Sequence, residues 1–132
     1  MKIFALGFLI LLSSCLKPHE VENRSHLVTR SSAERNISTI KNAISLDDYN
    51  ADPKLYLDKQ LVAFDTMGQR SIQWVSKKRA QGLDAYNLHG GILAWAHDGG
   101  SFVDQQGHDT KVVHVYSKAW DMLPEGFEAI TE

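Results

Sequence analysis

The sequence predicts an α/β domain in which a mostly parallel sheet is covered by helices on both faces. Two observations lead to this class. Short apolar runs rich in β-branched residues, such as His26-Leu27-Val28-Thr29 and Leu61-Val62-Ala63-Phe64, are typical of buried strands. These runs alternate with amphipathic stretches, of which Ser71 to Gln81 is the clearest. Strands that alternate with helices indicate a parallel sheet with helices on both faces.

The composition is that of an ordinary globular domain. The 132 residues suffice for one domain with its own core, and hydrophobic residues make up 43% of them. A net charge of −2 gives no electrostatic case for nucleic acid as a partner. The six histidines are scattered without metal-ligand spacing, so we expect no metal and no cofactor.

Residues 1–14 are expected to be a lipoprotein signal peptide. Lys2 gives a positive start, and Ile3 to Leu12 is an apolar run too short to span a bilayer, which takes about 20 residues. Leu12-Ser13-Ser14-Cys15 resembles the lipobox of bacterial lipoproteins. This resemblance implies that Cys15 is diacylated and becomes the new N-terminus. An ordinary secretory signal followed by a chance cysteine is the alternative.

The lipid on Cys15 would make the membrane a partner of this chain. Two acyl chains suffice for stable anchoring, so we expect a cell-envelope protein that faces the periplasm. The outer membrane is slightly favoured, because Leu16 is not the acid that commonly retains lipoproteins at the inner membrane. Residues 15–25 are expected to form a flexible tether, since they lack apolar periodicity. Cys15 is the only cysteine, which excludes an internal disulfide.

Residues 26–132 are expected to form the domain. The expected elements are strands at 26–29, 43–46, 60–64 and 83–86, a helix at 71–81 and a short helix at 92–97. Gly82 stands where a helix C-terminus often has a glycine, and Asp98-Gly99-Gly100 stops the short helix. The polar stretch 47–58 is broken by Pro53. From Ser101 on, the chain is expected to wrap the core.

The candidate site is the stretch that follows the strand at 60–64. It consists of seven residues, Asp65, Thr66, Met67, Gly68, Gln69, Arg70 and Ser71. A buried strand ends on Asp65, a glycine-bearing loop follows, and Arg70 leads into the helix. Such a loop points several backbone N–H groups into its own concavity, a geometry that binds an anion or holds a reactive side chain. Ligands of parallel sheets sit at the carboxyl ends of strands, where Asp65 lies.

Three blocks of the sequence resemble the rhodanese-like (sulfurtransferase) domain. Residues 27–34 and 37–44 resemble its early segment, usually L-V-D-V-R-x-x-x-E and then H-I-x-G-A. Residues 65–71 resemble its active loop, C-x-x-G-x-R-S. Residues 86–95 match its closing signature, Y-N-L-x-G-G-I-x-A-W, almost residue for residue. The resemblance spans roughly residues 26 to 97 and implies a sheet of about five strands flanked by helices.

The resemblance also implies a chemistry that Asp65 prevents. In active members the loop cysteine takes a sulfane sulfur from thiosulfate or a similar donor and holds it as a persulfide. The loop amides and the arginine stabilise that charged sulfur. Asp65 stands at the position of this nucleophile. A carboxylate cannot carry a persulfide, and it repels thiosulfate and accepts the loop N–H bonds itself. We therefore expect no catalytic residue here, with Asp65 satisfied by loop amides and paired with Arg70.

Two further departures from the family pattern lie outside the loop. Thr29 replaces the usual acid of the first strand, which is expected to leave Arg30 without its family partner. Lys41-Asn42 replaces the usual Pro-Gly before Ala43.

These expectations favour a membrane-anchored, catalytically inactive module that binds an envelope protein partner or a small anion at the loop. One alternative is an enzyme of a different type that uses Asp65 as general base and Arg70 as anion clamp. Phosphatases of the haloacid dehalogenase type need a second acid where Met67 stands, and cysteine phosphatases need a Cys-x5-Arg motif that the loop lacks. A degraded paralogue with no selected role is a third interpretation.

Overall fold

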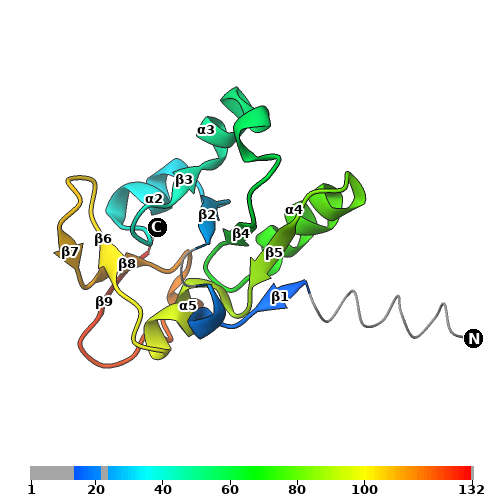
Figure 1. Cartoon of the computed structure of the whole chain (residues 1–132). Helices are drawn as coiled ribbons and strands as arrows, with labels where there is room; N and C mark the ends of the chain where they lie inside the picture. Colours follow the sequence, from blue (N-terminus) through cyan, green and yellow to red (C-terminus); the bar gives the residue numbers. More distant parts are fainter. Residues whose placement is uncertain (1–13, 22–23, 132) are drawn as a thin grey trace, which may run out of the picture.

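The computed structural model describes residues 14–21 and 24–131. Its centre is a five-stranded sheet of order β1-β5-β4-β2-β3, in which all neighbouring strands are parallel (Figure 1). The strands are β1 (Cys15–Leu16), β2 (Ser25–Val28), β3 (Ile44–Ser45), β4 (Leu61–Phe64) and β5 (Ala85–Leu88). The predicted fold class, a parallel α/β sheet of about five strands, is confirmed.

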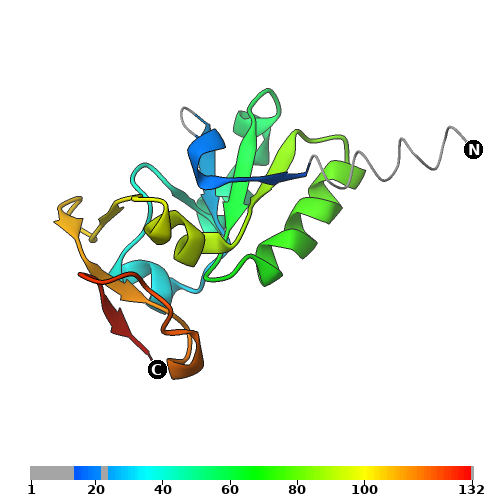
Figure 2. The same cartoon turned by 90° about the horizontal axis from the view of Figure 1, so that it is seen from below.

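Four α-helices and three 3₁₀ helices are described around this sheet. They are α2 (Ser32–Ile37), α3 (Leu46–Ala51), α4 (Gln69–Ala80), α5 (Gly91–His97), η1 (Pro18–Glu20), η2 (Pro53–Tyr56) and η3 (Lys118–Trp120). Two small strand pairs follow in the chain: antiparallel β6 (Phe102–Val103) with β7 (Asp109–Thr110), and parallel β8 (Val112–His114) with β9 (Glu128–Ile130). The C-terminal segment lies beside α2, as both ribbon views show (Figures 1 and 2).

Strand β4 shows why both faces of the sheet are covered. Successive side chains of a strand point to opposite faces. Val62 and Phe64 pack in one hydrophobic cluster with residues of α5 and the C-terminal segment, whereas Leu61 and Ala63 pack in a second cluster with Val75 of α4. All four strand residues are at most 1% exposed. The prediction of helices on both faces is therefore confirmed.

Helix α4 begins and ends at glycines. Gly68 is its N-cap at φ +93°, and Gly82 follows its C-cap at φ +87°, conformations that residues with a Cβ rarely adopt. The helix begins at Gln69, two residues earlier than predicted, because Gly68 lets the chain turn directly into it. Ile72, although apolar, is 48% exposed. Val75 is the fully buried apolar residue of this helix.

One predicted strand is displaced along the chain, and one helix was not predicted. The strand expected at 83–86 is β5 (Ala85–Leu88), because the N–H of Leu83 still closes the end of α4 on the carbonyl of Lys78 at 3.0 Å. The unpredicted helix is α3, which begins at Leu46 and takes up the first residues of the polar stretch 47–58. The hydroxyl of Ser45 caps this helix by accepting from the N–H of Asp48 at 2.9 Å.

The expectation of a flexible tether at 15–25 was also wrong for its described residues. Cys15 and Leu16 form the edge strand β1, paired in parallel with β5. The N–H groups of Asn87 and His89 donate to the carbonyls of Ser14 at 2.7 Å and Leu16 at 2.8 Å. Val21 is fully buried in the main hydrophobic cluster. This segment therefore belongs to the domain, and backbone hydrogen bonds to the edge of the sheet hold it despite its polar sequence.

The proposed signal peptide falls almost entirely on residues 1–13, which lie outside the described residues. Within residues 14–21 and 24–131, the structure has no helix long and apolar enough to cross a membrane.

Candidate functional site

The loop after β4 closes around the carboxylate of Asp65. This residue stands at the carboxyl end of the strand and is 2% exposed. Its Oδ1 accepts a hydrogen bond from the N–H of Gly68, and its Oδ2 accepts from the N–H groups of Arg70 at 2.6 Å and Ser71 at 3.3 Å. The concavity predicted for an anion thus holds the carboxylate of the loop itself. A charge that accepts several amide hydrogen bonds is strongly stabilised where it is.

The segment 86–95, the closing signature, is hydrogen-bonded to the backbone of this loop. The N–H groups of Ile92 and Leu93, at the start of α5, donate to the carbonyls of Asp65 at 2.9 Å and Thr66 at 3.3 Å. Gly91 makes this approach feasible, because a Cβ on it would lie 2.4 Å from the carbonyl oxygen of Asp65. The two sequence blocks at 65–71 and 86–95 therefore form one structural unit.

Arg70 bridges two carboxylates at the rim of the loop. Its guanidinium donates to both oxygens of Glu34 at 3.1 Å each, and its Nε lies 3.4 Å from Oδ2 of Asp65. Burial alone would lower the pKa of Arg70, but Glu34 and Asp65 outweigh it and raise the pKa above its ordinary value. Arg70 is therefore charged and paired on both sides, although its side chain remains 41% exposed.

Glu34 is the centre of a buried ion-pair cluster beneath the loop. It is 1% exposed and also accepts from Nε of Arg30 at 3.2 Å and from the hydroxyl of Thr66 at 3.3 Å. Burial would raise the pKa of Glu34, but the hydrogen bonds from Arg70 and the charges of Arg30 and Arg70 lower it to about 2. Two arginines thus keep this buried carboxylate ionised.

Arg30 was expected to lack its family partner at position 29, and the structure pairs it with other groups instead. Besides Glu34, its guanidinium donates to the carbonyls of Ser38 at 3.4 Å and of His114. Thr29 donates its hydroxyl to the carbonyl of Phe64 at 2.8 Å and is not among the described residues that accept from Arg30. The C-terminal segment therefore supplies one of the acceptors of Arg30.

A small cavity of about 150 Å³ opens over the loop. Its lining residues are Asp65, Met67, Gln69, Arg70, Tyr116 and Trp120. Met67, Gln69 and Arg70 belong to the predicted site loop, whereas Tyr116 and Trp120 come from the C-terminal segment and were not predicted at the site. The rings of Tyr116 and Trp120 lie 5.1 Å apart at 32°, and the guanidinium of Arg70 lies 5.5 Å from the centre of the Tyr116 ring.

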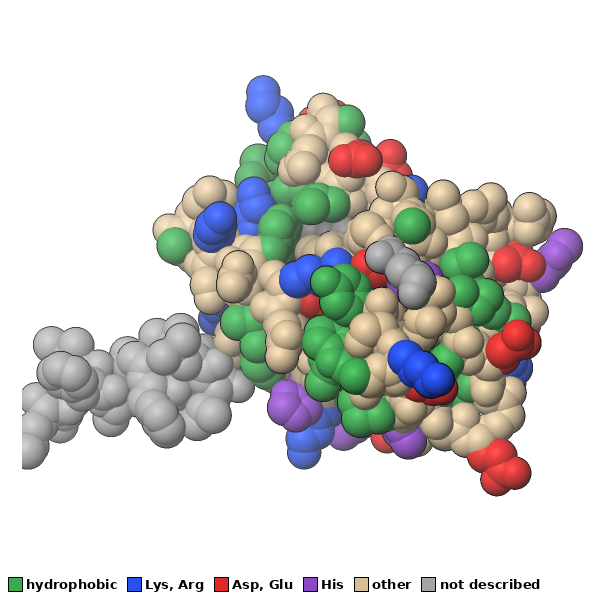
Figure 3. Space-filling view, turned by 180° about the vertical axis from the view of Figure 1, so that it is seen from behind, with side chains coloured by type: hydrophobic (Ala, Val, Ile, Leu, Met, Phe, Trp, Pro, Cys, Tyr) green, Lys and Arg blue, Asp and Glu red, His purple; other side chains and the backbone are tan. Residues whose placement is uncertain are grey.

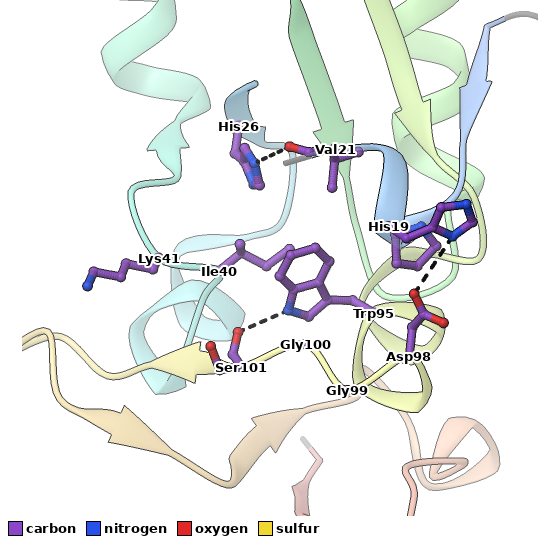
Figure 4. Close-up of a pocket in the computed structure, with 11 residues that line it drawn as sticks. His19, Val21, His26, Ile40, Lys41, Trp95, Asp98, Gly99, Gly100 and Ser101 are labelled. Carbon is purple, nitrogen blue, oxygen red and sulfur yellow. Dashed lines mark hydrogen bonds and ion pairs between the residues drawn. The ribbon is translucent and has the colours of Figure 1, made fainter. Parts of the chain in front are cut away.

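A larger cavity of about 710 Å³ lies away from the loop and contains none of its residues (Figure 4). Trp95 forms one wall, with its indole N–H donated to the carbonyl of Ser101 at 2.9 Å. His26 faces Trp95 edge-on at 6.2 Å, and its Nε2 lies 3.3 Å from the carbonyl oxygen of Val21. Burial lowers the pKa of His26 below its usual range, so the imidazole is neutral at pH 7. This wall is therefore aromatic and uncharged.

No group of three or more metal-ligating side chains is found among residues 14–21 and 24–131. The functional residues that sequence reasoning missed are Glu34, Tyr116 and Trp120. Glu34 carried a signal, since it is the last residue of the early rhodanese-like block. The segment with Tyr116 and Trp120 lies outside all three blocks and carried no signal for the site.

A parallel sheet covered by helices on both faces, with a candidate site in the loop after its central strand, defines an α/β protein. Solved structures of this fold match the chain. It is similar to a rhodanese-related protein from Thermoplasma volcanium (TM-score 0.60, 22% identity, 67% of this chain and 96% of that one). It is also similar to a rhodanese-like domain protein from Staphylococcus aureus (TM-score 0.54, 24% identity, 62% and 90%).

A protein from Bacillus halodurans matches over a longer stretch, with a TM-score of 0.65, 16% identity, and 80% and 88% of the two chains covered. No family model matches the sequence, and neither does any curated protein. At these identities the structural matches establish the rhodanese-like fold and nothing finer.

Proposed function

We propose that this chain is a lipid-anchored, catalytically inactive rhodanese-like module of the bacterial cell envelope that acts by binding at the loop 65–71. The observation that carries the proposal is the carboxylate of Asp65, which accepts hydrogen bonds from three loop amides. A persulfide would need these same amides, and a carboxylate cannot form one. The only cysteine, Cys15, lies in the edge strand β1 rather than in the loop.

The same contacts argue against Asp65 as a general base. A general base must reach the proton of a substrate with a free lone pair. The side chain of Asp65 is 3% exposed, and its oxygens are engaged by Gly68, Arg70 and Ser71. Arg70, the partner in that alternative, is itself held by Glu34 on one side and Asp65 on the other. Both groups would have to be released before they could act on a substrate.

The proposed anchoring places the domain directly at the membrane. If Cys15 carries the lipid, no flexible residues separate it from the sheet, since Leu16 is already held by His89. The module would then have little freedom to move away from the bilayer. Metabolic labelling with a radioactive fatty acid tests this step. We expect label on the full chain and none on its Cys15→Ala variant; label on the variant would contradict anchoring through Cys15.

Sulfur transfer from thiosulfate to cyanide tests catalytic inactivity. Residues 14–132 contain every described strand and helix, so this chain with Cys15→Ser is compared with the same chain carrying Asp65→Cys as well. We expect the first to be silent and the second to turn over, because the loop amides remain in place. Sulfur transfer by the chain that retains Asp65 would overturn the proposal. If neither chain transfers sulfur, the loop has lost more than its nucleophile, and the binding role would have to be sought on another surface.

A further inference from the structure

The charged groups at the mouth of the site compensate one another. Arg70 is paired with both Glu34 and Asp65, and the loop amides that face Asp65 are already used. A second anion would therefore meet the carboxylate of Asp65 instead of free donors, and a cation would meet Arg70 at the rim. A ligand without charge fits this balance best.

Aromatic and apolar side chains make up the rest of the cavity. Tyr116 and Trp120 form a tilted pair on one side, and Met67 lies on the loop side. This pair is not covered from solvent, since Tyr116 is 47% exposed and Trp120 is half-buried. One face of the molecule has hydrophobic side chains gathered near its centre, beside basic and acidic ones (Figure 3).

Tyr116 is held in an unusual backbone conformation at this mouth. Its φ is +70°, in the left-handed region that a bulky residue rarely adopts. Its N–H donates to the ring nitrogen Nδ1 of His114 at 3.0 Å, and the next N–H, of Ser117, donates to the carbonyl of Val115 at 2.8 Å. The strained residue is nevertheless 47% exposed, so core packing does not explain it. Strain of this kind clusters at ligand clamps and switch regions.

We propose that this cavity receives one uncharged apolar side chain, up to the size of a phenyl group, from a protein partner. This inference rests on the proposed binding role of the loop. The sequence left the ligand open between a protein partner and a small anion, and the cavity favours the protein partner. An apolar cavity of about 150 Å³ accommodates benzene. It is smaller than the roughly 300–1,000 Å³ typical of small-molecule sites. Protein interfaces receive anchoring side chains in small pockets.

Disulfide capture at the rim tests the preference of the cavity directly. Gln69, which lines the mouth and is exposed, is changed to Gln69→Cys in residues 14–132 with Cys15→Ser. The chain is equilibrated with small disulfides that carry methyl, isobutyl, benzyl, carboxylate or ammonium groups, and capture is read by intact mass spectrometry. Gln73→Cys, one turn further along α4 and also exposed, is the matched control. Capture at either introduced cysteine does not depend on whether the chain transfers sulfur, so this test is separate from the sulfur-transfer test.

We expect benzyl and isobutyl groups to be captured about tenfold better than methyl at residue 69, with no such preference at residue 73. Trp120→Ser and Tyr116→Gly, each tested for cooperative unfolding, should both remove the preference. Preferred capture of the carboxylate, or a benzyl preference unchanged by both variants, would overturn the proposal. A tripeptide disulfide bearing phenylalanine should be captured at least as well as the bare benzyl group. Weaker capture of the tripeptide would overturn the assignment to a protein partner.

Discussion

Replacing Glu34 with glutamine removes the charge at the centre of the cluster beneath the loop. Glu34 is 1% exposed, and the side chain of Arg30 beside it is 0% exposed. Removing one partner of a buried ion pair costs roughly 3–5 kcal/mol, because the remaining charge stays buried without compensation. We expect Glu34→Gln to lower the free energy of unfolding at pH 7 by about this amount.

The lowered pKa of Glu34 leads to a similar magnitude for this contribution. It falls from 4.5 to about 2 on folding. At 1.36 kcal/mol for each pH unit, this corresponds to about 3 kcal/mol. Because the pKa of the folded state is the lower one, the contribution is fully present above pH 4.5 and is lost as the pH falls from 4.5 toward 2.

Urea denaturation of residues 14–132, followed by circular dichroism between pH 7 and pH 3, measures both effects. Glu125→Gln, which removes an exposed carboxylate, is the matched control and should change stability little. The difference between wild type and Glu34→Gln should be largest at pH 7 and shrink below pH 4.5. A difference under about 1 kcal/mol at pH 7, or one that does not change with pH, would refute the reasoning.

Three further predictions concern the backbone around the site. Gly91→Ala places a Cβ 2.4 Å from the carbonyl oxygen of Asp65, so it should lower the unfolding free energy by more than about 2 kcal/mol, whereas Gly107→Ala, with open space around it, should cost only about 1 kcal/mol. Tyr116→Gly should be more stable than Tyr116→Ala by about 1 kcal/mol, since glycine adopts φ +70° without strain; equal stabilities would contradict this strain. Val21→Asp should cost at least about 2 kcal/mol in urea denaturation, whereas a flexible tether would tolerate it.

Sequence patterns could predict those parts of the fold whose signals are local. The apolar run at 61–64 indicated β4, and Gly82 indicated the end of α4. Strand β1 could not be predicted in this way, because two residues show no periodicity and their position depends on the exposed edge of β5. Val21 is likewise buried by tertiary contacts, and no pattern in the neighbouring sequence predicts its burial.

The same distinction applies to the candidate site. The contacts of Asp65 with Gly68, Arg70 and Ser71 join residues at most six positions apart, so the loop motif itself suggests them. The pairing of Arg70 with Glu34 joins residues 36 positions apart, and no spacing rule connects them. Tyr116 follows β8 by two residues, and β8 packs beside α2. This tertiary packing places Tyr116 in the lining of the cavity, next to loop residues far from it in the sequence.

The carboxylate of Asp65 occupies the concavity that would otherwise bind an anion. Isothermal titration of thiosulfate into residues 14–132, and into the same chain with Asp65→Ser, tests it most directly. The serine variant frees the amides of Gly68, Arg70 and Ser71 and leaves Arg70 in place. We predict no measurable binding to the wild type and saturable binding to the variant. Wild-type binding as tight as that of the variant would contradict the account.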